Sequence, residues 1–154
     1  MRRLMLESRG GIPNNPALAV RLYPAAVDGS DRGAAFEARF AANGWPPQWR
    51  DGVFDYHHYH STAHEVLGCY AGRATLTIGG PGGETVEIAA GDALMLPAGT
   101  GHKCEEASDD FGVVGAYPAG QEWDVVTTPA DVAIHARIAA VPVPERDPVT
   151  GEPF

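Results

Sequence analysis

Residues 53–60 read VFDYHHYH, a run dominated by aromatic and imidazole side chains. The period-two alternation in this run predicts a β-strand that places Tyr56, His58 and His60 on one face. Two imidazoles separated by one residue on a strand have Cα atoms roughly 6.5 Å apart on the same side. Both can therefore reach one metal ion through bonds of roughly 2.0–2.1 Å. His58 and His60 are accordingly the first candidate metal ligands.

Two residues further along the chain extend this candidate metal site. Glu65 begins the next predicted strand, from which its carboxylate can supply an oxygen ligand. His102 follows a tight glycine-rich turn at residues 97–101, which could bring a third imidazole from across a barrel. Three nitrogen ligands and one oxygen leave about one or two positions open on a six-coordinate ion. Divalent iron, manganese, nickel or cobalt suits such a site, and zinc suits it at lower coordination number.

Turn-forming residues are frequent, because 19 glycines and 13 prolines make up 32 of the 154 residues. This share exceeds the roughly 12% of average usage and predicts short strands joined by many turns, as in a β-barrel or β-sandwich. Besides residues 53–60, we expect strands at Ala17–Tyr23, Glu65–Ala71, Arg73–Ile78, Glu84–Ala89, Ala93–Leu96, His102–Glu106, Phe111–Tyr117 and Trp123–Thr127.

A helix is expected before the strand-rich region, capped by Ser30 or Asp31 and ending near Ala42. Phe36 and Phe40 lie four residues apart on this helix and therefore share one face. An apolar face of this kind packs against another element. We expect the helix to cover part of the core.

Two further segments flank the predicted strands. The loop at residues 44–49 contains two tryptophans, which favours its packing over an apolar surface. A second helix is expected with Thr128 as its cap, Pro129 at its first position and an end near Ala140. The proline-rich residues 141–144 cannot be helical and are expected to be extended.

Two spaced patterns in the chain resemble the two motifs of the cupin superfamily. Residues 52–72 read G-x5-HYH-x4-E-x6-G, and residues 91–102 read G-x5-PAG-x2-H. Where the second motif commonly ends in Asn, this chain has Glu106. Four further segments extend the resemblance to the YjlB-like small bacterial cupins: HHYHSTAHE at 57–65, LPAGTGH at 96–102, VGAYP at 114–118 and NNP at 14–16.

The resemblance implies a mainly all-β fold, a double-stranded β-helix or jelly-roll barrel of roughly six to eight strands. It implies one cupin domain over residues 1–154, with the barrel at about 53–127 between extensions at 1–52 and 128–154. It also implies a divalent transition metal (Fe, Mn, Ni, Co or Zn) held by the motif residues His58, His60, Glu65 and His102.

Three other residues are candidates for lining the pocket around that ion. Tyr56 shares the predicted face of the histidines, Cys69 shares a strand face with Glu65, and Cys104 shares one with His102. Each has an alternative interpretation as core filling, since tyrosine and unpaired cysteine are often simply buried.

The two remaining histidines of this region receive weaker predictions. His57 faces away from the barrel by alternation and is expected at the surface or an interface. His64 precedes Glu65 and could either hydrogen-bond behind the ligands or face solvent, the latter being slightly favoured.

Charge and cysteine content narrow the range of partners. The 11 basic and 20 acidic residues give a formal net charge of −9, which argues against binding nucleic acid or an anionic membrane. No apolar run approaches the roughly 18 residues of a membrane span, and no secretory signal is recognisable. We therefore expect a cytoplasmic protein with two free thiols. We also expect a small-molecule ligand or substrate and a homodimer, which the strand near residues 17–23 could help to form.

The leading functional hypothesis is a metal-dependent enzyme acting on a small molecule, with dioxygenase-type oxidoreductase chemistry preferred over isomerase chemistry. Cupins with this ligand set also include oxalate-degrading enzymes and binding or regulatory modules, so the fold does not choose among these functions. The alternative is a module that binds or senses a small ligand without transforming it.

Overall fold

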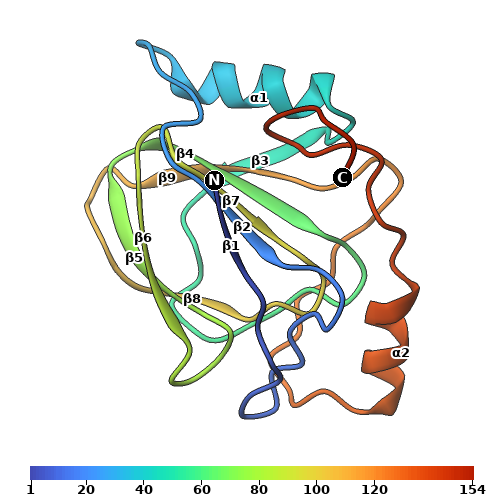
Figure 1. The fold of residues 1–154 in the computed structure, drawn as a ribbon. Coiled ribbons are helices and arrows are strands. Elements are labelled where there is room, and N and C mark those ends of the chain that lie inside the picture. Colours follow the sequence, from blue (N-terminus) through green and yellow to red (C-terminus); the bar gives the residue numbers. More distant parts are fainter.

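Two antiparallel β-sheets and two helices make up the structure, a computed structural model that describes residues 1–154 (Figure 1). The helices are α1 (Arg32–Ala42) and α2 (Val132–Ala140). The strands are β1 (Arg2–Leu4), β2 (Val20–Tyr23), β3 (Pro47–Asp51), β4 (Glu65–Ala71), β5 (Arg73–Ile78), β6 (Glu84–Ala89), β7 (Ala93–Leu96), β8 (His102–Ala107) and β9 (Gly112–Ala116). No helix has the length and apolar character needed to cross a membrane.

The chain passes repeatedly between the two sheets, which confirms the predicted jelly-roll fold. The larger sheet has the order β1-β2-β7-β4-β9-β3, and the smaller one has the order β6-β5-β8. Consecutive strands β4 and β5 lie in different sheets and are joined at Gly72, whose φ of +68° suits glycine. A Cβ at this position would also lie 2.4 Å from the Ser108 hydroxyl oxygen. A glycine is therefore required where the chain changes sheets.

Apolar side chains fill the space between the sheets and a second layer outside the larger sheet. Between the sheets, Leu67 and Leu76 are fully buried in one cluster. On the outer face of the larger sheet, Phe36 and Phe40 of α1 are also fully buried. The Phe36 ring lies so close to β4 that a Cβ on Gly68 would come within 2.5 Å of it. The expected apolar face of the first helix is therefore confirmed.

The predicted strand at residues 53–60 is wrong. The regular strand there is β3, which ends at Asp51 after pairing with β9 at the edge of the larger sheet. The expected loop at residues 44–49 accordingly becomes strand from Pro47, a position where an edge strand tolerates proline. Beyond Asp51 the chain bends, and only isolated bridges form, from His58 to His102 and from Tyr59 to Val126. Backbone pairing with two different segments replaces a regular strand.

The second helix starts later than predicted. Asp131 caps α2 by accepting a hydrogen bond from the Ile134 N–H at 2.9 Å, so neither Thr128 nor Pro129 belongs to the helix. The Thr128 carbonyl instead accepts a hydrogen bond from the Tyr59 hydroxyl at 2.8 Å. The expected strand at Trp123–Thr127 is likewise reduced to the bridge at Val126.

The C-terminal tail is anchored by the buried carboxylate of Asp147. It accepts hydrogen bonds from the Tyr23 hydroxyl and, at 2.9 Å, from Arg21. It also accepts hydrogen bonds from the backbone N–H groups of Val149 and Thr150, both at 2.8 Å. Burial alone would raise the pKa of Asp147, but these donors outweigh it and lower the pKa.

Candidate metal centre

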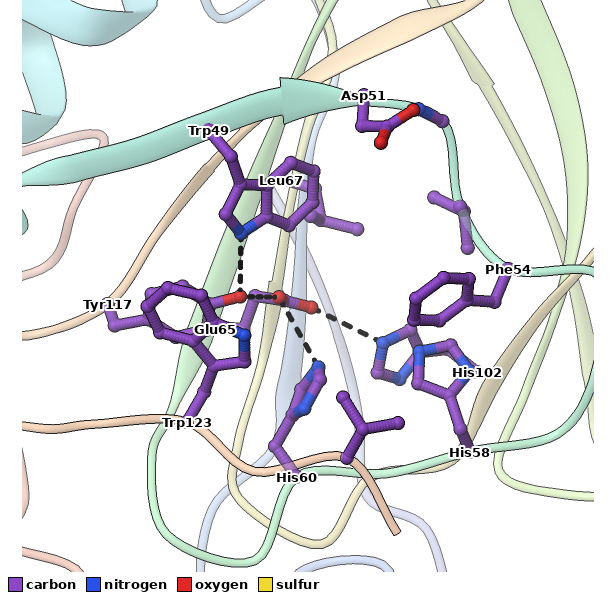
Figure 2. Close-up of a pocket in the computed structure, with 13 residues that line it drawn as sticks. Trp49, Asp51, Phe54, His58, His60, Glu65, Leu67, His102, Tyr117 and Trp123 are labelled. Atoms are coloured by element: carbon purple, nitrogen blue, oxygen red, sulfur yellow. Dashed lines mark hydrogen bonds and ion pairs between the residues drawn. The ribbon is translucent and has the colours of Figure 1, made fainter. Parts of the chain in front are cut away.

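Three buried histidines meet at one end of the space between the sheets (Figure 2). His58 and His60 come from the irregular segment before β4, and His102 is the first residue of β8. His58 and His102 exchange two backbone hydrogen bonds, of 2.9 and 3.3 Å, which fix the two segments side by side. The ligand-capable nitrogens of the three rings all lie within 4.8 Å of one another.

Backbone carbonyls fix the tautomer of each of these histidines. The partners of the Nδ1 atoms are the carbonyl oxygens of Tyr56 (3.0 Å) for His58, Thr100 (3.0 Å) for His102 and Asp124 for His60. A carbonyl oxygen only accepts, so each Nδ1 must carry the hydrogen. The Nε2 atoms are consequently the ones that can bind a metal ion, which is the arrangement found at histidine metal ligands.

Glu65, the first residue of β4, brings a carboxylate to the same point. Its side chain is buried, and its two oxygens lie 3.3 Å from Nε2 of His60 and 3.3 Å from Nε2 of His102. Oε2 also accepts a hydrogen bond of 2.6 Å from the Tyr117 hydroxyl, which in turn accepts one of 2.9 Å from Trp49 Nε1. This chain of bonds, drawn in Figure 2, holds the Glu65 carboxylate in one orientation.

Burial and neighbouring charges set the ionisation of these groups. Burial, reinforced by the neighbouring His102, lowers the pKa of His58 to about 3, so this imidazole is neutral at neutral pH. Burial opposes charge on both His60 and Glu65, but their mutual attraction outweighs it. It raises the pKa of His60 and holds the pKa of Glu65 well below its ordinary value. Without a bound ion, the Glu65 carboxylate therefore stabilises a proton on His60, which a bound cation would replace.

The donor set fits a divalent transition metal. Three imidazole nitrogens and a carboxylate converge in a buried space, and such groups repel one another unless a proton or a cation lies among them. No lysine or arginine lines this space. Nitrogen donors combined with a single carboxylate suit iron, manganese, cobalt, nickel or zinc better than calcium or magnesium.

The candidate ligands open onto a cavity of about 340 Å³. Its walls are mostly aromatic and aliphatic. Trp123 and Phe54, 40% and 49% exposed, stand at the solvent side. The Trp123 ring stacks on Tyr117 with centroids 4.3 Å apart and planes 3° apart. The lining residues are Trp49, Asp51, Gly52, Val53, Phe54, His58, His60, Glu65, Leu67, His102, Tyr117, Trp123 and Val125.

Residues 121–126 form one wall of this cavity, and we call this segment the strap. Several of its hydrogen bonds run to residues 59–64, the segment that follows His58 and carries His60. The Asp124 carboxylate accepts hydrogen bonds from the backbone N–H of Ser61, at 2.6 Å, and from its hydroxyl. The strap therefore fixes the orientation of the His60 ring, and it also contributes Trp123 and Val125 to the cavity wall.

The three additional pocket candidates do not line the cavity. Tyr56 is 42% exposed because the chain bends where alternation predicted a strand, and it contributes its carbonyl instead of its ring. Cys69 and Cys104 do share the inner faces expected of them, but they lie deeper, in the core cluster with Leu67. Burial raises the pKa of Cys69 to about 11 and also raises that of Cys104, so both thiols stay protonated at neutral pH.

The other two histidines differ in their surroundings. His57 is half-buried and does not line the cavity, and its charged neighbours are Lys103 and Glu105. The slightly favoured placement of His64 in solvent is wrong, because only 1% of this residue is exposed. Its Nδ1 accepts a hydrogen bond of 2.8 Å from the Ala98 N–H, which stabilises the turn that leads to His102.

Comparisons with known proteins agree with this architecture. The sequence profile of the cupin domain matches residues 46–114. The chain is 39% identical over 145 residues to the protein named Uncharacterized protein YjlB from Bacillus subtilis (strain 168), covering 93% of this chain and 86% of that protein. It is 36% identical over 97 residues to a probable oxalate decarboxylase from Arthroderma benhamiae, covering 56% of this chain but only 23% of that protein.

Two solved structures match parts of the chain with TM-scores below 0.5. One is an 11S allergen from Cocos nucifera, with a TM-score of 0.41 and 23% identity over 51% of this chain and 23% of that one. The other is a DUF861 family protein from Thermotoga maritima, with a TM-score of 0.40 and 17% identity over 62% of this chain and 96% of that one. Given the profile match and the near full-length similarity to YjlB, the chain belongs to the cupin family, in the group that contains YjlB.

Proposed function

We propose that this protein is a metal-dependent enzyme that transforms a small oxygen-bearing molecule, with dioxygenase chemistry as the preferred class. The observation that carries the proposal is the convergence of three imidazole nitrogens and the Glu65 carboxylate at a cavity that opens to solvent. His58, His60, His102 and Glu65 would hold one divalent ion. A closed structural site would instead surround its ion with protein ligands on every side.

A bound ion of this kind polarises an oxygen-bearing substrate and, when it is iron, supports reaction with dioxygen. The protein's own contribution is positioning. The backbone carbonyls hold the three imidazoles in one tautomer, and Tyr117 orients Glu65. The apolar walls exclude water from the reacting molecule, which strengthens every electrostatic interaction at the site.

Oxalate decarboxylation, which the name of one relative suggests, is less well supported. Oxalate carries two negative charges at neutral pH, and enzymes commonly hold such anions with arginine or lysine. The cavity offers neither, and Asp51 and Glu65 are its two acidic residues. The wall is therefore better suited to a less highly charged molecule.

The test is oxygen consumption by iron(II)-loaded protein with a panel of small aromatic and aliphatic oxygen donors. We expect at least one compound to be consumed with dioxygen, and His60→Ala to abolish both the bound iron and the consumption. The exposed α2 residue His135 offers the matched control, because His135→Ala should change neither. If wild-type protein holds iron stoichiometrically and binds ligands but consumes none, a binding or sensing module replaces the enzyme.

A further inference from the structure

We infer that the cavity selects a flat, ring-sized ligand that carries oxygen donors and at most one negative charge. The inference rests on the proposed metal site, since the ion would receive the oxygen donors. It goes further by assigning size, shape and charge to the molecule that the site accepts. Each of the three properties follows from a different feature of the cavity wall.

The size limit comes from the volume of the cavity, about 340 Å³. One water molecule occupies about 30 Å³ in the liquid, so the cavity holds the equivalent of about eleven waters. Ligand pockets start at about 300 Å³, which places this one at the small end of the range. A single substituted ring fills such a space, whereas a two-carbon acid leaves most of it to water.

The shape preference comes from aromatic rings on both sides of the candidate ligands. Figure 2 shows Trp49 and Trp123 on the Tyr117 side of Glu65, and Phe54 beside His58 and His102 on the other side. Phe54 meets His58 edge to face at 5.1 Å between ring centroids. Flat rings bind well between aromatic side chains, because stacked and edge-to-face contacts add to simple area burial.

The charge limit comes from the absence of lysine and arginine among the lining residues. A divalent ion with the Glu65 carboxylate leaves a net charge of one positive unit, which one anionic oxygen neutralises. A second negative charge would find no cation in the wall, and Asp51 at the exposed rim would repel it. Apolar walls make this uncompensated charge more costly than it would be in water.

Four simple acids separate these properties when they bind to the cobalt(II)-loaded protein. Salicylate has a ring and one charge, phthalate has a ring and two, glycolate has one charge and no ring, and oxalate has two charges and no ring. Visible absorption of the cobalt and fluorescence of Trp49 and Trp123 report binding. Each affinity is divided by that of the same acid for the aqueous cobalt ion, so that intrinsic chelating strength cancels.

We expect this affinity ratio to be largest for salicylate, about tenfold above that of glycolate, because the ring makes aromatic contacts. The ratio should be lower for phthalate than for salicylate, and lower for oxalate than for glycolate. A ratio for oxalate that equals or exceeds that for salicylate would overturn the inference. Protein that takes up no cobalt at all is a separate result, which refutes the metal site and the proposed function with it.

A charge-gain variant tests the electrostatic part independently. Val125 lines the cavity and is 46% exposed, so Val125→Lys places a cation in the wall without disturbing the core. It should raise the affinity for oxalate and phthalate by about fivefold and leave glycolate nearly unchanged. Val132→Lys is the matched control, because Val132 is 86% exposed on α2 and does not line the cavity. Unchanged dianion binding in Val125→Lys would refute the charge limit.

Discussion

Replacing Tyr117 by phenylalanine tests whether the residues behind Glu65 hold it in place for a metal ion. The change removes the 2.6 Å hydrogen bond to the Glu65 carboxylate and leaves the Trp49 N–H without its 2.9 Å partner. Loss of a hydrogen bond to a buried charged group costs about 2 kcal/mol. For a protein of this size, that corresponds to a lower melting temperature by about 4–8 °C. Loss of an orienting partner also weakens metal binding by about 10- to 100-fold.

Tyr23→Phe provides a matched control, since its hydroxyl also donates to a buried carboxylate, that of Asp147, away from the cavity. Both variants should lose similar stability in urea denaturation of the metal-free protein. Only Tyr117→Phe should lose metal affinity, measured by competition with a chromophoric chelator. Equal metal affinity in wild type and Tyr117→Phe would show that Tyr117 does not hold Glu65 for the metal, as would an equal loss of affinity in the control.

Three further changes test other parts of the structure. Asp124→Ala should weaken metal binding, measured by chelator competition, by about tenfold, because the strap then holds the His60 tautomer less firmly. Glu122 is exposed on the same strap, and Glu122→Ala should leave the metal affinity unchanged. Asp147→Asn should cost about 1–3 kcal/mol of unfolding free energy at pH 7. The pKa of Asp147 is depressed in the folded state, so its ionised form stabilises the fold above the unfolded pKa of about 3.9. This stabilisation is lost as pH falls below that value through the folded-state pKa. The difference in unfolding free energy between wild type and variant, measured in urea, should therefore shrink at pH 3. Phe36→Ala should cost about 3–5 kcal/mol by the same measurement while metal affinity stays as in wild type, since the ring packs outside the larger sheet.

The frequent turns predicted a β-barrel or β-sandwich, and the resemblance to the cupins specified the jelly-roll. The spacing of the motif residues grouped the four candidate ligands. His58, His60 and Glu65 lie within one short segment, and His102 follows a turn whose glycines identify it. The structure brings these four side chains together. The inner faces of β4 and β8 were also predictable, because regular strands alternate.

The residues that support the ligands could not be predicted, because their contacts join distant parts of the chain. Tyr117 reaches Glu65 across 52 positions, and Asp124 reaches His60 across 64. No short-range pattern encodes such a pairing; it depends on the register between β4 and β9 and on the path of the strap. The same cause explains the error at residues 53–60, where backbone pairing with two distant segments overrides local alternation.

The most direct test of the account is the metal content of the purified protein, combined with a crystal structure measured at the absorption edge of that metal. We predict about one equivalent of a transition metal, with an anomalous peak bonded to Nε2 of His58, His60 and His102 and to a Glu65 oxygen at about 2.0–2.2 Å. His102→Ala should lose the peak and keep the fold. A metal-supplemented crystal in which the ion lies elsewhere, with these four side chains uncoordinated, would contradict the account.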